Sequence, residues 1–67
     1  MIGVSVNGQR RELETATTVA SLVEEMACGR RGIAVAVNSE VVPRSTWGSW
    51  TLAPGDRIEV LRAAQGG

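Results

Sequence analysis

The sequence contains no histidine and only one cysteine, Cys28. Zinc sites in proteins need clustered Cys and His ligands, so we expect no metal site. A single cysteine also excludes an internal disulfide. Helical spacing places Cys28 opposite the apolar stripe of an expected helix and near the helix C-terminus, where the helix dipole disfavours a thiolate. The sequence therefore favours an incidental cysteine over a sulfur-handling thiol.

The chain also lacks an excess of charge of either sign. Its 67 residues include 7 basic and 7 acidic ones, so the formal net charge is zero. A nucleic-acid binder normally gathers a basic excess on one face, whereas the basic clusters here are only two pairs, Arg10-Arg11 and Arg30-Arg31. The longest strictly apolar run, residues 33–37, is far shorter than the roughly 20 residues of a membrane-spanning helix. No secretory signal is visible, so we expect a cytoplasmic protein that binds neither nucleic acid nor membrane.

A chain of this length forms one small domain with a thin hydrophobic core. Such a domain has little room for a deep pocket with its own catalytic residues. The adjacent acids Glu24 and Glu25 are interpreted as the solvated face of a helix rather than as an acid/base pair. The size therefore favours a protein that binds or is acted upon, and not an enzyme.

Alternating apolar residues predict strands at both ends of the chain. Over residues 2–6 the apolar side chains share one face, which is typical of a half-buried strand. Asn7-Gly8 indicates a type I′ hairpin turn, because that turn needs positive φ at both central residues. The more polar return over residues 9–13 predicts a strand near an edge. Residues 33–37 and 57–62 are further predicted strands, with Ile58 and Val60 on one face of the last strand and Leu61 on the other.

A helix is predicted between the second and third strands. Thr18 is suited to the N-cap, because its hydroxyl accepts a hydrogen bond from a free backbone amide. An apolar stripe at i, i+3, i+4 and i+7 follows, formed by Val19, Leu22, Val23 and Met26. Gly29 is placed where a left-handed residue would end the helix.

The order β-β-α-β-(β)-β predicts a two-layer α+β domain, with a mixed sheet of four or five strands and one main helix on one face. The first and last strands are expected in the sheet centre. Residues 38–40 are predicted as a turn, 41–42 as a short extended piece, and 44–52 as irregular with one helical turn. Residues 1–62 are expected to form the domain, and residues 63–67 a flexible tail.

Two kinds of candidate site remain open on the residues alone. Trp47 and Trp50 either seal the core or offer a platform for a partner, and core sealing is favoured for Trp47. Gly66-Gly67 is either a frayed end or a reactive carboxylate. Glycine suits the second reading, because a tail without Cβ atoms passes through a narrow channel. The five tail residues reach about 17 Å when extended, far enough to enter another protein's active site.

Several segments together resemble a known family, the thiamine-biosynthesis sulfur carriers of the ubiquitin-like β-grasp superfamily. The similarity covers nearly the whole chain, and the most specific combination is Val-Pro-Arg-x-x-Trp, Gly-Asp and a final Gly-Gly. The matching segments are residues 6–8, 18–22, 35–38, 41–47, 54–60 and 66–67.

The resemblance implies a function for the tail. An E1-like adenylyltransferase of the ThiF type would adenylate the Gly67 carboxylate with Mg-ATP, and a donor such as a cysteine desulfurase would supply sulfur. The resulting thiocarboxylate would give its sulfur to a thiazole synthase of the ThiG type. ATP and magnesium would belong to the activating enzyme, so this chain would bind no cofactor and would itself be a carrier. Gly66 and Gln65 would serve in tail recognition.

The resemblance also implies a docking surface, the sheet face away from the helix. Leu61 is expected there as the apolar contact, with Ala34 and Ala36 allowing close approach of a partner. Other functions stay open: the small subunit of molybdopterin synthase, a ubiquitin-like modifier, a carrier for cysteine synthesis, or a non-covalent interaction module. The Val-Pro-Arg-x-x-Trp segment and the short chain favour the thiamine carrier.

Overall fold

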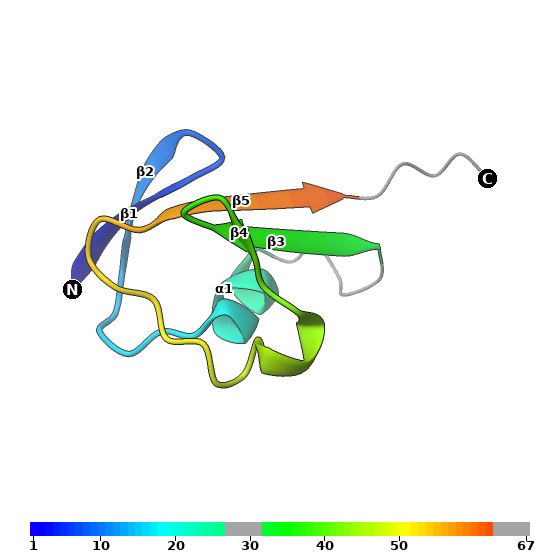
Figure 1. Ribbon diagram of the computed structural model, residues 1–67. Coiled ribbons are helices and arrows are strands. Elements are labelled where there is room, and N and C mark those ends of the chain that lie inside the picture. The colour runs from blue at the N-terminus through cyan, green and yellow to red at the C-terminus, as the bar shows by residue number, and fades with distance from the viewer. Residues whose placement is uncertain (27–31, 63–67) are drawn as a thin grey trace.

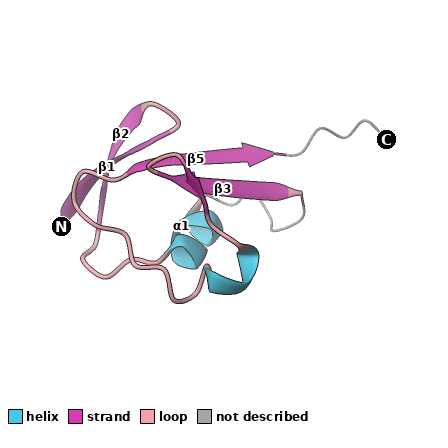
Figure 2. Ribbon diagram, viewed as in Figure 1, coloured by secondary structure: helices cyan, strands magenta, loops and turns pink. Residues whose placement is uncertain are grey.

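The computed structural model describes residues 1–26 and 32–62. The described residues form a sheet covered on one face by a helix and by the loops around a short 3-10 turn (Figures 1 and 2). The elements in chain order are β1 (Ile2–Val6), β2 (Gln9–Leu13), α1 (Val19–Glu25), β3 (Ile33–Val37), β4 (Glu40–Val41), η1 (Arg44–Thr46) and β5 (Arg57–Arg62). The predicted α+β class and order of elements are confirmed.

The sheet has five strands in the order β2-β1-β5-β3-β4. Strands β1 and β5 pair in parallel, and the other neighbours are antiparallel. The first and last strands of the chain therefore lie side by side inside the sheet, as predicted. Strand β2 lies at one edge, also as predicted, and the two-residue strand β4 forms the other edge.

Left-handed residues make both hairpin turns. Asn7 and Gly8 have φ of 52° and 84°, which confirms the expected turn between β1 and β2. Asn38 and Ser39 have φ of 53° and 72° and join β3 to β4. The second turn is therefore one residue shorter than predicted, because Glu40 already pairs with Val37 as the first residue of β4.

The core lies between the sheet and α1. It takes alternate residues of β1, β3 and β5, which confirms the faces predicted from alternation. Its buried members are Ile2, Val4, Val6, Leu13, Val19, Leu22, Val23, Ile33, Val35, Val37, Val42, Trp47, Leu52, Ile58 and Val60. No polar or charged side chain is buried in the part of the chain that the structure describes.

Helix α1 begins as the sequence predicts. The Oγ1 atom of Thr18 accepts a hydrogen bond from the Ser21 amide at 3.2 Å. The apolar stripe faces the core, and Met26 packs against it as the partly buried C-cap residue. The helix thus ends at Glu25, earlier than the glycine signal suggested. That signal, Gly29, lies outside the described residues.

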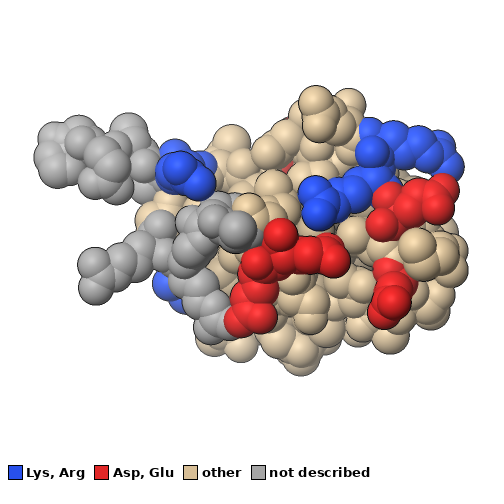
Figure 3. Space-filling model, turned by 180° about the vertical axis from the view of Figure 1, so that it is seen from behind, with Lys and Arg blue, Asp and Glu red and all other residues tan. Residues whose placement is uncertain are grey.

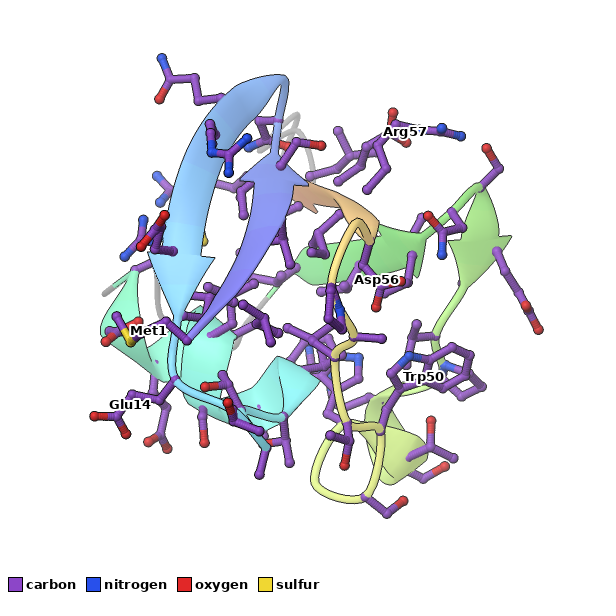
Figure 4. The ribbon with its side chains drawn as sticks, turned by 90° about the vertical axis from the view of Figure 1, so that its left-hand side faces the viewer. Met1, Glu14, Trp50, Asp56 and Arg57 are labelled. Carbon is purple, nitrogen blue, oxygen red and sulfur yellow. The ribbon has the colours of Figure 1, made fainter. Side chains whose placement is uncertain are left out.

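Trp47 seals the core beneath η1. Its side chain is buried, and its Nε1–H donates to the Val42 carbonyl at 3.0 Å. The Arg44 guanidinium lies 5.1 Å from the centroid of the Trp47 ring. The core interpretation is confirmed for Trp47, while Trp50 packs against the core only partly buried, on the side of η1 (Figure 4). The single helical turn expected within residues 44–52 is η1.

Among the described residues no helix is long and apolar enough to cross a membrane. Within the same residues, no cluster of three or more His, Cys, Asp or Glu side chains is arranged to hold a metal ion.

Candidate functional site at the end of strand β5

The structure describes the strand that leads to the predicted reaction group, but not the group itself. The Gly67 carboxylate and the tail-recognition residues Gly66 and Gln65 lie outside the described residues, as does Cys28. Their predicted roles stay predictions. The site is therefore built from β5 and from the sheet face around its last residues.

Strand β5 is held between two neighbours. It pairs with β3 in antiparallel register from Ile58, opposite Val37, to Arg62, opposite Ile33. Its parallel pairing with β1 is shorter and covers only Arg57 and Ile58. The end of β5 lies at the opposite end of the molecule from the N-terminus (Figure 1). The chain after Arg62 thus starts from a sheet end that the N-terminus does not obstruct.

The predicted docking residues share the sheet face away from α1. Leu61 is 61% exposed, whereas Ile58 and Val60 are buried on the helix side. Ala34 is exposed and lies directly opposite Leu61 in the β3–β5 register. Ala36 is half-buried and lies opposite Glu59. The structure therefore brings the three residues together on one face, as predicted, and their role in docking stays a prediction.

One further apolar residue of this face escaped the sequence reasoning. Val41 lies opposite Ala36 in the β3–β4 register and is 71% exposed. Residues opposite each other in an antiparallel pair present their side chains on the same face. Val41 therefore extends the outer face to the sheet edge, with the two small alanines between it and Leu61. A two-residue strand is too short for alternation to reveal its faces.

Over β1, an arginine side chain covers the outer face of the sheet. A Cβ atom at Gly3 would stand 3.0 Å from Nη2 of Arg10, so the Arg10 side chain lies close over the Gly3 backbone. Any larger residue at position 3 would require the end of the Arg10 side chain to shift by a few tenths of an ångström. A basic group thus covers the β1–β2 side of the face, while the Leu61 side carries small and apolar groups.

Acidic side chains gather where the end of β2 and the following loop lie beside α1. Glu12, Glu14, Glu24 and Glu25 line an open hollow of about 710 Å³ together with Met1, which Figure 4 shows beside Glu14. Figure 3 shows acidic side chains lying below basic ones on the rear side. The ion pair between Arg11 and Glu25, at 3.7 Å, is partly exposed and contributes little stability. Glu24 and Glu25 are exposed, which agrees with their interpretation as a solvated helix face.

Two asparagine side chains hold β5 in place, and the sequence reasoning missed both. The Val60 amide donates to Oδ1 of Asn7 at 2.9 Å, and Nδ2 of Asn7 donates to the Val60 carbonyl at 3.3 Å. At the start of the strand, the Arg57 amide donates to Oδ1 of Asn38 at 2.9 Å. Both asparagines occupy turn positions with positive φ, which asparagine tolerates, so the sequence can indicate the turns. It does not indicate the bonding partners, which are 53 and 19 positions away.

These features together define a β-grasp domain of the carrier type. A five-stranded mixed sheet carries one helix on one face, and its last strand presents an exposed apolar residue just before the C-terminal segment. The comparison with protein families agrees with this class, since the model of the ThiS family matches residues 4–67. The chain belongs to the ThiS family, and its function is that of a sulfur carrier in thiamine biosynthesis.

Two curated relatives are similar over nearly the whole chain. The sulfur carrier protein ThiS of Escherichia coli (strain K12) is 31% identical over 61 residues, which cover 91% of this chain and 92% of that protein. A thiazole synthase of Paramagnetospirillum magneticum is 32% identical over 62 residues, which cover 92% of this chain. The chain spans only 19% of the length of that synthase.

Solved structures show the same fold. The crystal structure of a thiamine biosynthesis protein (ThiS) from Geobacter metallireducens matches with a TM-score of 0.84 and 25% identity, over 98% of this chain and all of that one. A solution structure of a thiamine biosynthesis protein from the same organism matches with a TM-score of 0.78 and 26% identity, over 98% of this chain and 88% of that one. The predicted β-grasp fold is thereby confirmed.

Proposed function

We propose that the Gly67 carboxyl group is the atom group that carries sulfur, and that the folded domain presents and identifies it. The observation that carries the proposal is that the ThiS family match runs to residue 67 and so includes the Gly-Gly end. The five residues 63–67 follow the end of β5, and a chain of five residues reaches about 17 Å when extended. That length suffices to bring the carboxylate into a partner's active site.

The chemistry begins with activation, because a carboxylate is a poor electrophile. An E1-like adenylyltransferase transfers AMP from Mg-ATP to the Gly67 carboxylate and releases pyrophosphate. The terminal sulfur of a persulfide donor then attacks the carbonyl carbon, and AMP leaves. A thiol reduces the resulting acyl disulfide, so that a C-terminal thiocarboxylate remains. ATP and magnesium are bound by the activating enzyme in this scheme.

The acceptor of the sulfur is a thiazole synthase. Support comes from the Paramagnetospirillum protein of that name, in which a segment of 62 residues resembles this chain. A carrier-like segment within a thiazole synthase is expected if carrier and synthase act together in one reaction. The sulfur donor is a persulfide-forming enzyme such as a cysteine desulfurase.

The docking surface is the outer sheet face around Leu61, Ala34 and Ala36. Burial of the exposed apolar side chain of Leu61 against a partner would favour association, because apolar surface leaves water. The alanines opposite Leu61 and Glu59 let a partner's backbone approach the sheet closely. Gly66 and Gln65 are proposed to guide the tail within the active site of the activating enzyme.

The decisive test is the intact mass of the chain after incubation with its activating enzyme, ATP, a persulfide donor and a thiol. We expect a mass increase equal to the difference between one sulfur and one oxygen atom. A variant without Gly67 is the matched control, because it keeps the domain but ends one residue earlier, so that its terminal carboxylate would fall short of the reaction site. An unchanged wild-type mass under conditions that charge another ThiS protein would refute the proposal.

A genetic test separates the thiamine pathway from the molybdopterin pathway. Deletion of the gene is expected to cause a growth defect that the thiazole precursor of thiamine rescues. Rescue by a molybdopterin precursor alone would instead favour the synthase-subunit alternative.

A further inference from the structure

The parallel pairing of β1 with β5 stops before β5 does. The Ser5 amide donates to the Asp56 carbonyl at 3.0 Å, and the Asn7 amide donates to the Ile58 carbonyl at 2.9 Å. At Asn7 the backbone turns into the hairpin with φ of 52° and leaves the sheet direction. Val60 is the next residue of β5 whose backbone N–H and C=O groups point toward β1. No backbone group of β1 is therefore aligned with them.

The carboxamide of Asn7 takes the place of the missing strand residue. Its Oδ1 accepts from the Val60 amide, and its Nδ2 donates to the Val60 carbonyl. A side-chain amide has the same donor and acceptor groups as a peptide unit, so it can continue a β-ladder for one position. Both bonds are partly buried, which protects them from competition by water.

We propose that Asn7 is a positioning residue for the sulfur-bearing tail, an inference that rests on the proposed function. With Asn7, β5 is held on both sides as far as Val60, immediately before Leu61. Without its carboxamide, the last contact on the β1 side is the backbone bond at Ile58, two residues earlier. Leu61 and Arg62 would then be held by β3 alone, and the direction in which Leu61 and the tail are presented would be less defined.

Asn38 provides a matched control within the same strand. It too has a left-handed backbone, with φ of 53°, and its Oδ1 accepts from a β5 amide, that of Arg57. It acts at the beginning of β5, at the end away from the tail. Replacement of each asparagine by glycine keeps the backbone conformation accessible and removes only the carboxamide. The pair Asn7→Gly and Asn38→Gly therefore differs mainly in which end of β5 is released.

The experiment measures adenylation by pyrophosphate exchange with the activating enzyme, at a temperature where both variants are folded. For Asn7→Gly we expect KM for the carrier to rise about three- to tenfold, the equivalent of one net hydrogen bond, with kcat little changed. Asn38→Gly is expected to retain the wild-type KM. Asn7→Asp keeps the acceptor for the Val60 amide and should lie between wild type and Asn7→Gly. Equal KM values for the two glycine variants would overturn the inference.

Amide hydrogen exchange gives a second readout that needs no enzyme. The Val60 amide, and the Leu61 amide that follows it on the β3 side, should exchange faster in Asn7→Gly but not in Asn38→Gly, because only the first variant frees this end of β5. Unchanged exchange in Asn7→Gly would refute the positioning role even if the wild type is charged normally. A wild-type chain that is never adenylated would refute the proposed function, and exchange would still decide whether Asn7 fixes the strand end.

Discussion

At the scale of single residues, Leu61 is a large apolar side chain that the fold leaves on the surface beside the end of β5. Its removal costs the isolated domain little, because it is 61% exposed and lies outside the core. Leu61→Arg is expected to change the free energy of unfolding by no more than about 0.5 kcal/mol. In contrast, burial of a charge in the interface should raise KM for adenylation about tenfold or more.

Val41→Arg is the matched control for this prediction. It makes the same change at an exposed apolar residue of the same face, but on the edge strand β4. We expect a smaller effect on KM, because Val41 is separated from Leu61 by β3. If Leu61→Arg leaves adenylation kinetics unchanged, the outer face around Leu61 is not the docking surface.

Trp47 is important for stability rather than for partner binding. Trp47→Phe removes the donor to the Val42 carbonyl and leaves space in a buried site. We expect a loss of about 2–4 kcal/mol in the free energy of unfolding, measured by urea denaturation and far-UV circular dichroism. Trp50→Phe should cost clearly less, since Trp50 is only partly buried. Equal losses for the two variants would contradict the assignment of Trp47 as the residue that seals the core.

At the scale of elements, α1 is short and depends on its N-cap. Seven residues form few internal hydrogen bonds, so the helix has little stability of its own. Thr18→Ala removes the acceptor for the Ser21 amide and is expected to lower the free energy of unfolding by about 1 kcal/mol. Thr18→Ser keeps the hydroxyl and should stay close to wild type in the same denaturation experiment. A stability loss shared by both variants would point to the methyl group instead of the cap.

Sequence patterns predict the elements whose residues alternate or repeat with a helical period. Strands β1, β3 and β5 follow from alternation because each buries one face, and the same parity places Leu61 outside. The bounds of β4 and the end of α1 are not predictable in this way, since they depend on pairing with Val37 and on packing of Met26. The Asn7–Val60 contact is still harder to foresee, because its partners meet only once the sheet has formed.

At the scale of the whole molecule, the described domain ends before the residues that are proposed to carry the sulfur. Among the described residues, the last one buried in the core is Val60, and the sheet ends at Arg62. We therefore predict that a chain truncated after Arg62 folds with nearly unchanged stability and accepts no sulfur. A change below about 0.5 kcal/mol shifts the melting temperature of a domain of this size by less than about 4 °C.

Calorimetry of the truncated chain tests this prediction, with Val60→Ala as a reference for damage to the core. That variant removes buried methyl groups from β5 and is expected to cost about 1–3 kcal/mol, a clearly larger drop in melting temperature. If truncation lowers the melting temperature as much as Val60→Ala does, residues 63–67 contribute to the folded domain and do not form an independent arm. The sulfur-bearing end would then be released from the domain only at a cost in stability, and the partner enzymes would have to supply that free energy on binding.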